Sequence, residues 1–244
     1  MHTQIVAALE RAAGRRATKG PAHAQPEPIT SYGMRADDQR ALWRECQRTF
    51  AGLALPDRLA LAKLLLASRV EEEGHVAMAV LRAGVAELTP AHFDEIDALL
   101  DDLSSWSITD DFASGKVSIT ARLLQRYPKE TLRLLERWNG SPHRWKRRAS
   151  VITFTRALAT SGEFIDDALR FCEALQHDPE DLVQKGVGWA LKDAMRAGPA
   201  AKRRVTAIVK RMRRDGVPAT ITLYAIRDLR GAEREAILRV KPAR

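Results

Sequence analysis

Apolar residues recur with helical spacing along almost the whole chain, and this pattern constrains the fold most. Leu, Ala, Arg and Glu dominate the 244 residues, and all four are strong helix formers. No segment shows the convincing apolar–polar alternation of a half-buried strand. We therefore predict an all-α protein, with helices over residues 2–18, 36–52, 56–69, 72–84, 91–103, 106–125, 128–138, 142–160, 163–176, 179–197, 199–214, 217–227 and 231–239.

Proline marks the start of many of these helices. In LTPAHFDEI, Thr89 is the expected N-cap and Pro90 the first helical residue. Short helices, short turns and a helix pair about every 40 residues are typical of an α-α superhelix of HEAT-like repeats, a solenoid. An irregular helical bundle is the alternative, because no strict repeat is visible. Basic residues on a concave solenoid face would form a groove for a duplex.

The expected organisation is one solenoid domain over residues 1–244. It comprises an N-terminal helix over 1–19, a Pro-rich polar loop over 20–31 and a repeat body over 32–240. No apolar stretch is long enough to span a bilayer, so we expect no membrane partner. A monomer is the simplest expectation for the oligomeric state.

The net charge of +9 and the pI of about 9.9 make a polyanion the first partner to consider. Nucleic acid fits best, and an acidic membrane surface comes second. A soluble protein that is basic without such a partner is the plain alternative. Cys46 and Cys172 lie far apart without a CxxC, and the six histidines are scattered. These features predict no disulfide, no metal site and a reducing cytoplasm.

Four short stretches combine residue types that bind or act on nucleotides. In SSWSITDDF, Trp106 and Asp110 are four residues apart and share one helix face, while Asp111 points elsewhere. In PHRWKRRAS, Trp145 lies beside Lys146, Arg147 and Arg148. The other two stretches are VQKGVGWALKD, with Lys185, Gly186, Gly188, Trp189 and Lys192, and the basic helix 201–215, with Lys202, Arg203, Arg204, Lys210, Arg211, Arg213 and Arg214.

Each stretch also has a purely structural interpretation. A Trp in an all-α protein is more often a core residue than a ligand platform. An Arg beside a Trp is often a stacked surface pair, a basic amphipathic helix is usually a solvated face, and Asp110 could cap a helix or pair with an Arg. A carboxylate beside a Trp, however, is of a kind enriched at functional sites.

Taken together, the stretches resemble the AlkD-type DNA alkylation repair glycosylases, which are built from HEAT-like helical repeats. The resemblance runs from about residue 32 to 237. Its motifs are SYGMRADDQR, SSWSITDDFA, RWNGSPHRWKRRASV, LVQKGVGWALKDA and DLRGAEREAIL. A WxxxD element, a WKRRA element and a QKGVGWALKD element in this order are fairly specific.

The resemblance implies a role for four residues. Asp110 matches the catalytic aspartate of the family's WxxxD motif, and Trp106 matches its tryptophan. Trp189 matches the tryptophan of the K-x-x-G-W motif, and Arg148 the arginine of W-x-x-R-A. The family removes cationic N3- and N7-alkylated purines from duplex DNA, with no metal or nucleotide cofactor and no flipping of the base into a tight pocket.

The chemistry of such a reaction fits these residue types. An alkylated purine is already a cation and leaves readily, so the sugar that takes on oxocarbenium character needs stabilisation. A carboxylate near C1′ supplies it electrostatically. Indole faces favour a positively charged nucleotide. Arg148, Trp145, Arg147, Lys185, Lys192 and the cations of the basic helix would hold phosphates.

One stretch departs from the family pattern. Where typical members carry an aromatic YMK-like element before the YG motif, residues 22–30 read AHAQPEPIT, with two prolines and no aromatic. A wall of the lesion site would then be missing or rebuilt.

Three functions follow from these observations. The first is a cytoplasmic, nucleoid-associated DNA glycosylase for alkylated purines, acting in base excision repair. The second is a non-catalytic HEAT-like module that binds damaged, bent or branched DNA. The third is a protein–protein scaffold, the commonest use of α-solenoids, which the +9 charge and the WKRR cluster argue against.

Overall fold

The computed structural model describes residues 1–13, 20–21, 29–34, 37–39, 41, 43–44, 50, 52–115 and 117–242. Within this part of the chain, no helix is long and apolar enough to cross a membrane. Much of the expected helix over 36–52 and most of the loop over 20–31 lie outside the described residues.

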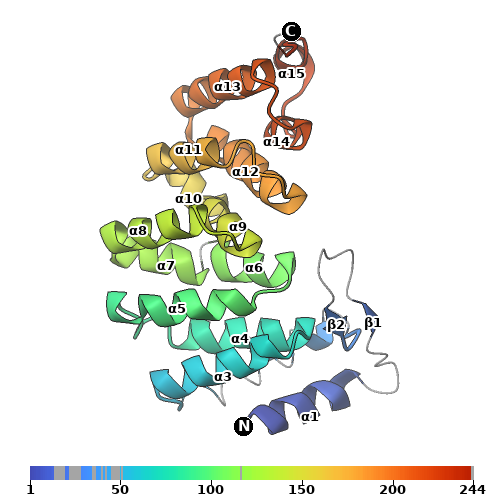
Figure 1. Cartoon of the computed structure of the whole chain (residues 1–244), viewed down its shortest axis with the longest axis vertical. Helices are drawn as coiled ribbons and strands as arrows, with labels where there is room; N and C mark the ends of the chain where they lie inside the picture. Colours follow the sequence, from blue (N-terminus) through green and yellow to red (C-terminus); the bar gives the residue numbers. More distant parts are fainter. Residues whose placement is uncertain are drawn as a thin grey trace. The chain divides into compact units, whose positions relative to one another are not determined.

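The described part of the chain is all-α apart from a two-residue antiparallel ladder, in which β1 (Gly20–Pro21) pairs with β2 (Thr30–Ser31), and an isolated bridge between Thr30 and Val70. Strands this short carry no detectable alternation, so the sequence pattern did not predict them. The α-helices are labelled in Figure 1 and comprise α1 His2–Ala13, α3 Leu55–Ala67, α4 Glu71–Ala83, α5 Phe93–Leu99, α6 Trp106–Ala113, α7 Ile119–Arg126, α8 Pro128–Asn139, α9 Arg144–Ile152, α10 Arg156–Ser161, α11 Ile165–Ala174, α12 Asp181–Ala194, α13 Pro199–Arg214, α14 Ala219–Ala225 and α15 Gly231–Leu238. The 3-10 helices are η2 Pro90–His92, η3 Leu100–Asp102 and η4 Met195–Ala197.

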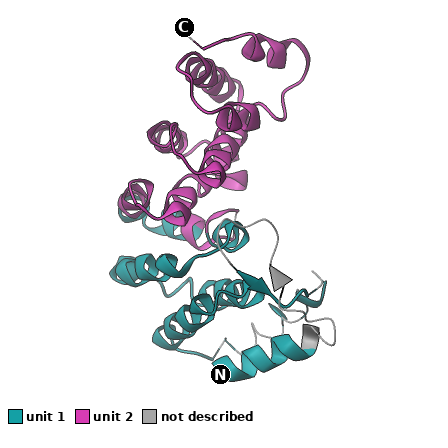
Figure 2. Cartoon of the chain, turned by 45° about the vertical axis from the view of Figure 1, so that its right-hand side comes forward, with its two compact units in different colours: residues 1–112, 122–131 teal, residues 113–121, 132–244 magenta. Residues whose placement is uncertain are grey.

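These elements form two compact units, shown in Figure 2: residues 1–112 with 122–131, and residues 113–121 with 132–244. In the first unit, α3 packs against α4 and α5. In the second, α12 packs against α9, α11 and α14, and α13 packs against α14 and α15. Consecutive helices thus pack in pairs, as in HEAT-like repeats. That the chain acts as one domain stays a prediction.

Two expected helices are each divided in two. The helix predicted over 106–125 ends with α6, and α7 begins only at Ile119, because Gly115 adopts a left-handed conformation with φ of 98°. The helix predicted over 142–160 ends with α9, and α10 begins at Arg156, which has φ of 56°. At η2, in contrast, Thr89 is the N-cap and Pro90 opens the helix, as predicted.

The SYG segment holds the first unit together through buried carboxylates of α4. Ser31 Oγ donates to Glu72 Oε1 at 2.8 Å, and the Tyr32 backbone N–H donates to Glu72 Oε2 at 3.0 Å. The Tyr32 hydroxyl donates to Glu73 Oε1 at 2.7 Å. Both glutamates are almost fully buried. Burial and the neighbouring Glu73 carboxylate raise the pKa of Tyr32, so the hydroxyl stays a donor.

The core of the second unit gathers around Trp138, Phe154 and Phe171, all buried. The rings of Phe154 and Phe171 stack with centroids 5.6 Å apart. Asn139, at the end of α8, donates its amide to Ser150 Oγ at 2.9 Å and to the Phe171 carbonyl at 3.3 Å. One buried amide therefore connects three helices, which accounts for the WN pair in RWNGS.

The two glycines of α12 serve helix packing. A Cβ at Gly188 would lie 2.6 Å from the Tyr224 Cβ and 2.8 Å from the Ile221 carbonyl oxygen of α14. A Cβ at Gly186 would lie 3.2 Å from the Ile152 side chain of α9. Gly188 thus allows α12 and α14 to approach each other at a distance that no side chain permits.

We expect Gly188→Ala to lower the free energy of unfolding by about 2 kcal/mol, although alanine is the better helix former. The Ile221 carbonyl belongs to the backbone of α14 and cannot rotate away. Urea unfolding monitored by circular dichroism measures the change. Gly140→Ala is the control, since its Cβ would meet only carbonyl oxygens at 4.0 Å, and equal stability of the two variants would contradict this account.

Candidate functional site

The helix that carries Trp106 and Asp110, α6, is anchored on α4 by its neighbouring residues. Ser107 Oγ donates to Glu71 Oε1 at 2.6 Å. Ile108 is buried against Gly74, where a Cβ would meet its Cδ1 at 2.3 Å. Ser105 Oγ accepts the Ser107 N–H at 3.2 Å, as an N-cap side chain does. These contacts fix the rotation of α6 about its own axis.

Asp111 completes this anchor. It pairs through both carboxylate oxygens with the Arg82 guanidinium, and the Arg82 Nη2–Oδ2 distance is 3.2 Å. Its Oδ2 also accepts from His75 Nδ1 at 3.1 Å, and the His75 ring lies 5.5 Å from that of Trp43. Burial alone would raise the pKa of Asp111, but the hydrogen bonds from His75 and Arg82 outweigh it and the pKa is lowered.

Trp106 and Asp110 lie on the face of α6 next to this anchor, as their spacing predicts. Both side chains are partly exposed, whereas Ile108, Thr109 and Phe112 are buried. The SSWSITDDF motif therefore combines residues that hold the helix on α4 with a partly exposed Trp106 and Asp110. A carboxylate with access to solvent beside an indole can stabilise a cation.

The WKRR cluster of α9 is largely structural. Trp145 is fully buried, so it is a core residue of the second unit and not a surface for a nucleotide. Arg147 donates through Nε to Asp178 Oδ2 at 2.5 Å and through Nη1 to the Ser141 carbonyl at 2.9 Å. Arg148 is 5% exposed and donates to the Leu182 carbonyl. Through these hydrogen bonds the two arginines hold the turn that leads into α12.

On α12 the predicted residues differ in their surroundings. Lys185 is exposed and pairs with Asp181 one turn earlier at 2.6 Å. Trp189 is partly exposed, and its indole Nε1–H donates to Asp193 Oδ2 at 2.8 Å. Lys192 Nζ lies 3.3 Å from Asp193 Oδ1 and 3.7 Å from Asp228 Oδ2. The indole of Trp189 is therefore oriented by a buried carboxylate.

A residue that the sequence did not indicate, Arg156, lies beside Trp189. Its guanidinium carbon is 5.2 Å from the centroid of the Trp189 ring, and its Nε donates to Ser114 Oγ at 3.0 Å. The Arg156 backbone N–H donates to Asp193 Oδ2 at 2.8 Å. With φ of 56°, Arg156 occupies the left-handed region that non-glycine residues rarely adopt. Such conformations cluster at functional sites.

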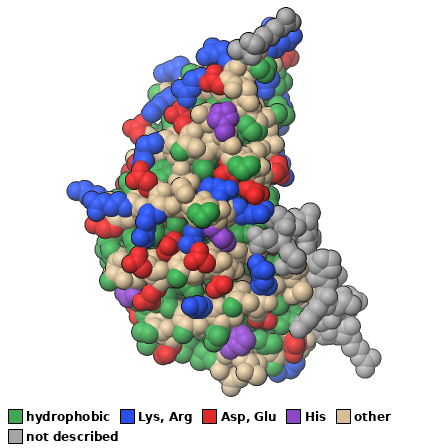
Figure 3. All heavy atoms as spheres, viewed as in Figure 1, with side chains coloured by type: hydrophobic (Ala, Val, Ile, Leu, Met, Phe, Trp, Pro, Cys, Tyr) green, Lys and Arg blue, Asp and Glu red, His purple; other side chains and the backbone are tan. Residues whose placement is uncertain are grey.

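Several cations of the basic helix α13 form ion pairs with acids of neighbouring helices. Lys202 pairs with Glu233 of α15 at 2.7 Å, and Arg204 and Arg211 pair with Asp166 and Glu173 of α11. Over α11 and α13, Figure 3 shows Lys and Arg side chains interspersed with Asp and Glu. A hollow of about 530 Å³ lies between these two helices. Arg148 and Trp189 lie on α9 and α12, so the basic helix and these residues are on different elements of the unit.

Among the described residues, Arg203 and Lys210 of α13 have no hydrogen-bond or ion-pair partner, and Arg203 is exposed. Arg214 likewise has no such partner among the described residues, and Arg213 donates only to carbonyl and hydroxyl oxygens, so no acid neutralises either charge. Exposed ion pairs such as Lys202–Glu233 contribute little to stability.

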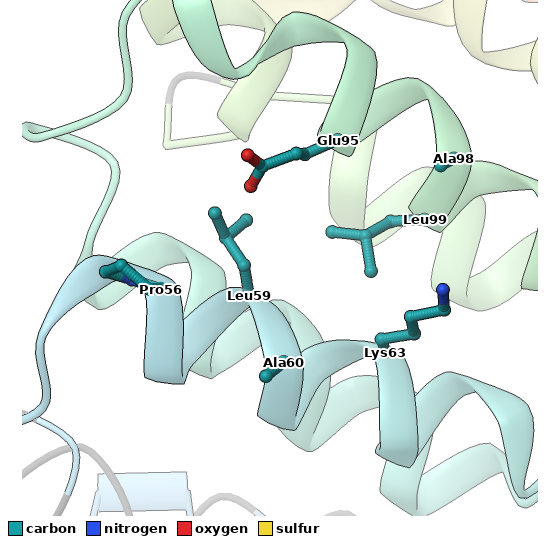
Figure 4. Close-up of a pocket in the computed structure, with 7 residues that line it drawn as sticks. All are labelled: Pro56, Leu59, Ala60, Lys63, Glu95, Ala98 and Leu99. Carbon is teal, nitrogen blue, oxygen red and sulfur yellow. The ribbon is translucent and has the colours of Figure 1, made fainter.

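A groove of about 290 Å³ between α3 and α5 belongs to the first unit. Figure 4 shows Leu59 and Leu99 pointing into it, with Lys63 and Glu95 at its sides. None of its lining residues is Trp106 or Asp110. Within the described part of the chain, no three His, Cys, Asp or Glu side chains come together as a metal site.

Comparison with known protein families agrees with these motifs. The chain matches the model of the family described as "DNA alkylation repair enzyme" over residues 5–229. It belongs to this family, as the sequence motifs predicted, and the family implies a DNA substrate. A search of curated proteins found no match.

Asp193 and Arg156 were the residues that sequence reasoning missed. For Asp193 a signal exists, because Trp189 and Asp193 repeat the WxxxD spacing of Trp106 and Asp110. At this spacing an Asp one turn after a Trp can accept the indole N–H, as α12 shows. For Arg156 no local signal exists, since its left-handed backbone depends on an acceptor 37 residues away.

Asp111→Asn should lower the free energy of unfolding at pH 7 by about 2 kcal/mol, because Arg82 and His75 lose a part-buried anionic partner. Since folding lowers the pKa of Asp111, its contribution is present above the pKa of the unfolded chain, about 4, and is lost as the pH falls. The stability difference between pH 7 and pH 3 should therefore be smaller in the variant. Urea unfolding at both pH values measures it.

The control for this variant is Asp57→Asn, which removes an exposed carboxylate in the same unit. It should leave both the stability and its pH dependence close to those of the wild type. An Asp111→Asn protein that loses as much stability on acidification as the wild type would contradict the role of this carboxylate.

At residue 156 we expect the usual order of helix formers to be reversed. Arg156→Gly should be more stable than Arg156→Ala by about 1 kcal/mol, because only glycine adopts φ of 56° without strain. At exposed Arg203 in α13, alanine should be the more stable replacement by a similar amount. Urea unfolding of the four variants gives the comparison, and alanine more stable than glycine at both positions would refute a strained Arg156.

Proposed function

We propose that this protein is a DNA glycosylase that excises cationic N3- and N7-alkylated purines from duplex DNA. The observation that carries the proposal is the partly exposed Asp110 one turn from Trp106, on a helix whose other face is fixed, in a chain of the DNA alkylation repair enzyme family. The net charge of +9 favours binding of the polyanionic substrate.

In this mechanism the substrate already carries the positive charge that makes its base a good leaving group. As the glycosidic bond breaks, the deoxyribose acquires oxocarbenium character, and the Asp110 carboxylate stabilises it electrostatically. The bonding electrons leave with the base, which becomes neutral. Asp110 also orients the water that attacks C1′, and the proton of that water passes to solvent.

Trp106 in the first unit and Trp189 in the second are each partly exposed, and an electron-rich indole face favours a cation. Arg203 and Lys210 supply charge for the DNA backbone without breaking an ion pair of the protein. Arg147 and Arg148 act differently from the expectation for phosphate-binding residues, because they hold the turn before α12 and thereby support Trp189.

Asp110→Asn should lower the release of 7-methylguanine from duplex DNA at least about 100-fold, because the amide cannot stabilise the developing cation. The affinity for the duplex should stay within about twofold, since the side chain acts on the transition state. Single-turnover base release by chromatography and fluorescence anisotropy of a labelled duplex give the two quantities.

Asp57→Asn, an exposed acid of the same unit, is the matched control and should release the base at the wild-type rate. Equal release by Asp110→Asn and the wild type would remove Asp110 from the mechanism. No release by the wild type, with the duplex still bound, would replace the glycosylase by a non-catalytic DNA-binding module.

A further inference from the structure

One oxygen of a buried carboxylate joins Trp189 and Arg156. Asp193 is 1% exposed. Its Oδ2 accepts the indole N–H of Trp189 and the backbone N–H of Arg156, each at 2.8 Å. Its Oδ1 faces the cations of Lys192 at 3.3 Å and Arg196 at 3.4 Å. Charge-assisted hydrogen bonds of this kind are stronger than neutral ones, so the carboxylate fixes both partners firmly.

Arg156 is exposed, yet its guanidinium is held in place. Its guanidinium carbon lies over the Trp189 ring, 5.2 Å from the centroid, and Nε–H donates to Ser114 Oγ. Among the described residues, Nη1 and Nη2 have no partner. The outer edge of the guanidinium therefore keeps its N–H donors for an anion, in a geometry that is set before the anion arrives.

Other arginines of this unit are used differently. Arg147 gives both Nε and Nη2 to Asp178, while Arg204 and Arg211 each pair with a carboxylate of α11. An anion that binds one of these must compete with a neighbouring acid. At Arg156 no such competition exists within the described residues, although the buried Asp193 lies at its backbone.

We propose that Arg156 is a preorganised receptor for a phosphodiester of the DNA backbone, and that Asp193 is its positioning residue. Asp193 holds Arg156 in its left-handed conformation and Trp189 in its rotamer, so that the guanidinium and the indole present one rigid surface. This inference rests on the proposed function in so far as the anion is DNA. A planar guanidinium fork matches two oxygens of one phosphate.

For the loss of Asp193, the proposal and simple electrostatics predict opposite changes in the affinity for DNA. Loss of an acid from a basic surface should by charge alone strengthen the binding of DNA. If Asp193 positions Arg156, its loss should weaken binding instead, because the guanidinium is no longer held. Asp228 is the matched control, since it lies against Lys192 and Arg196 too, at 3.7 and 2.7 Å, but has no hydrogen bond to Trp189 or Arg156.

The probe is a labelled duplex with a tetrahydrofuran abasic analogue, which has no base to release. Its dissociation constant is measured by fluorescence anisotropy at several salt concentrations. Arg156→Gly, which keeps the backbone N–H bonded to Asp193, should bind about tenfold more weakly, with the slope of log K against log salt reduced by about 1. Asp193→Ala should show the same two changes, and Asp228→Ala should bind at least as tightly as the wild type.

The double variant separates positioning from general stability. Arg156→Gly combined with Asp193→Ala should bind within about twofold of Asp193→Ala alone, because the guanidinium is already misplaced in the single variant. If Asp193→Ala does not fold, Asp193→Asn replaces it in the same cycle, with a loss of about threefold expected from its weaker neutral acceptor.

Three results would overturn the proposal. Wild-type affinity and slope in Arg156→Gly would exclude a phosphate contact at this arginine. Unchanged or tighter binding by the Asp193 variant would mean that Asp193 affects DNA binding only through its negative charge. A further tenfold loss of affinity in the double variant would mean that Asp193 acts independently of Arg156. Because the probe carries no base, a wild type that fails to release 7-methylguanine leaves these results valid, whereas a wild type that binds no duplex refutes both proposals.

Discussion

Buried carboxylates that pair with a neighbouring element are the interaction on which this structure depends. Most of its helices span only 6 to 14 residues, too few to be stable in isolation. Apolar packing holds such helices together but specifies their rotation weakly, since many apolar side chains fit a similar site. A charged group in the interior has few acceptable partners, so it selects one arrangement. Glu72 does this for the SYG segment and Asp193 for α12 and α10, and the part-buried Asp111 plays the same role for α6.

A Trp followed by an Asp four residues later occurs in both units, and the Asp has different surroundings in each. Trp106 and Asp110 on α6 are both partly exposed, and the neighbouring Asp111 takes the structural role. On α12 the Asp of the second WxxxD is buried and orients the Trp. A tryptophan with an acid one turn later is thus a local geometry, which occurs with a partly exposed acid on α6 and with a buried acid on α12.

The cations of the chain differ in whether a neighbouring group already pairs with them. Many cations of the basic stretches are paired with an acid nearby, so the number of Lys and Arg residues overstates how many are left for DNA. Cations without a partner carry more weight in the proposed function because no ion pair has to break when a phosphate binds. Arg156 is the most constrained of these, with its backbone strained and its side chain stacked.

The sequence by itself determined the helical class, most helix positions, the family and the shared face of Trp106 and Asp110, because these depend on periodicity, proline positions and residues one turn apart. Only the tertiary structure decided which tryptophan is core and which arginines are already paired. Trp145 is buried and Arg147 is bound to Asp178, 31 residues away. It also divided two expected helices, at Gly115 and at Arg156. The physical reason is common to all of these: burial and partner choice arise from residues distant in sequence, whereas helix propensity is local.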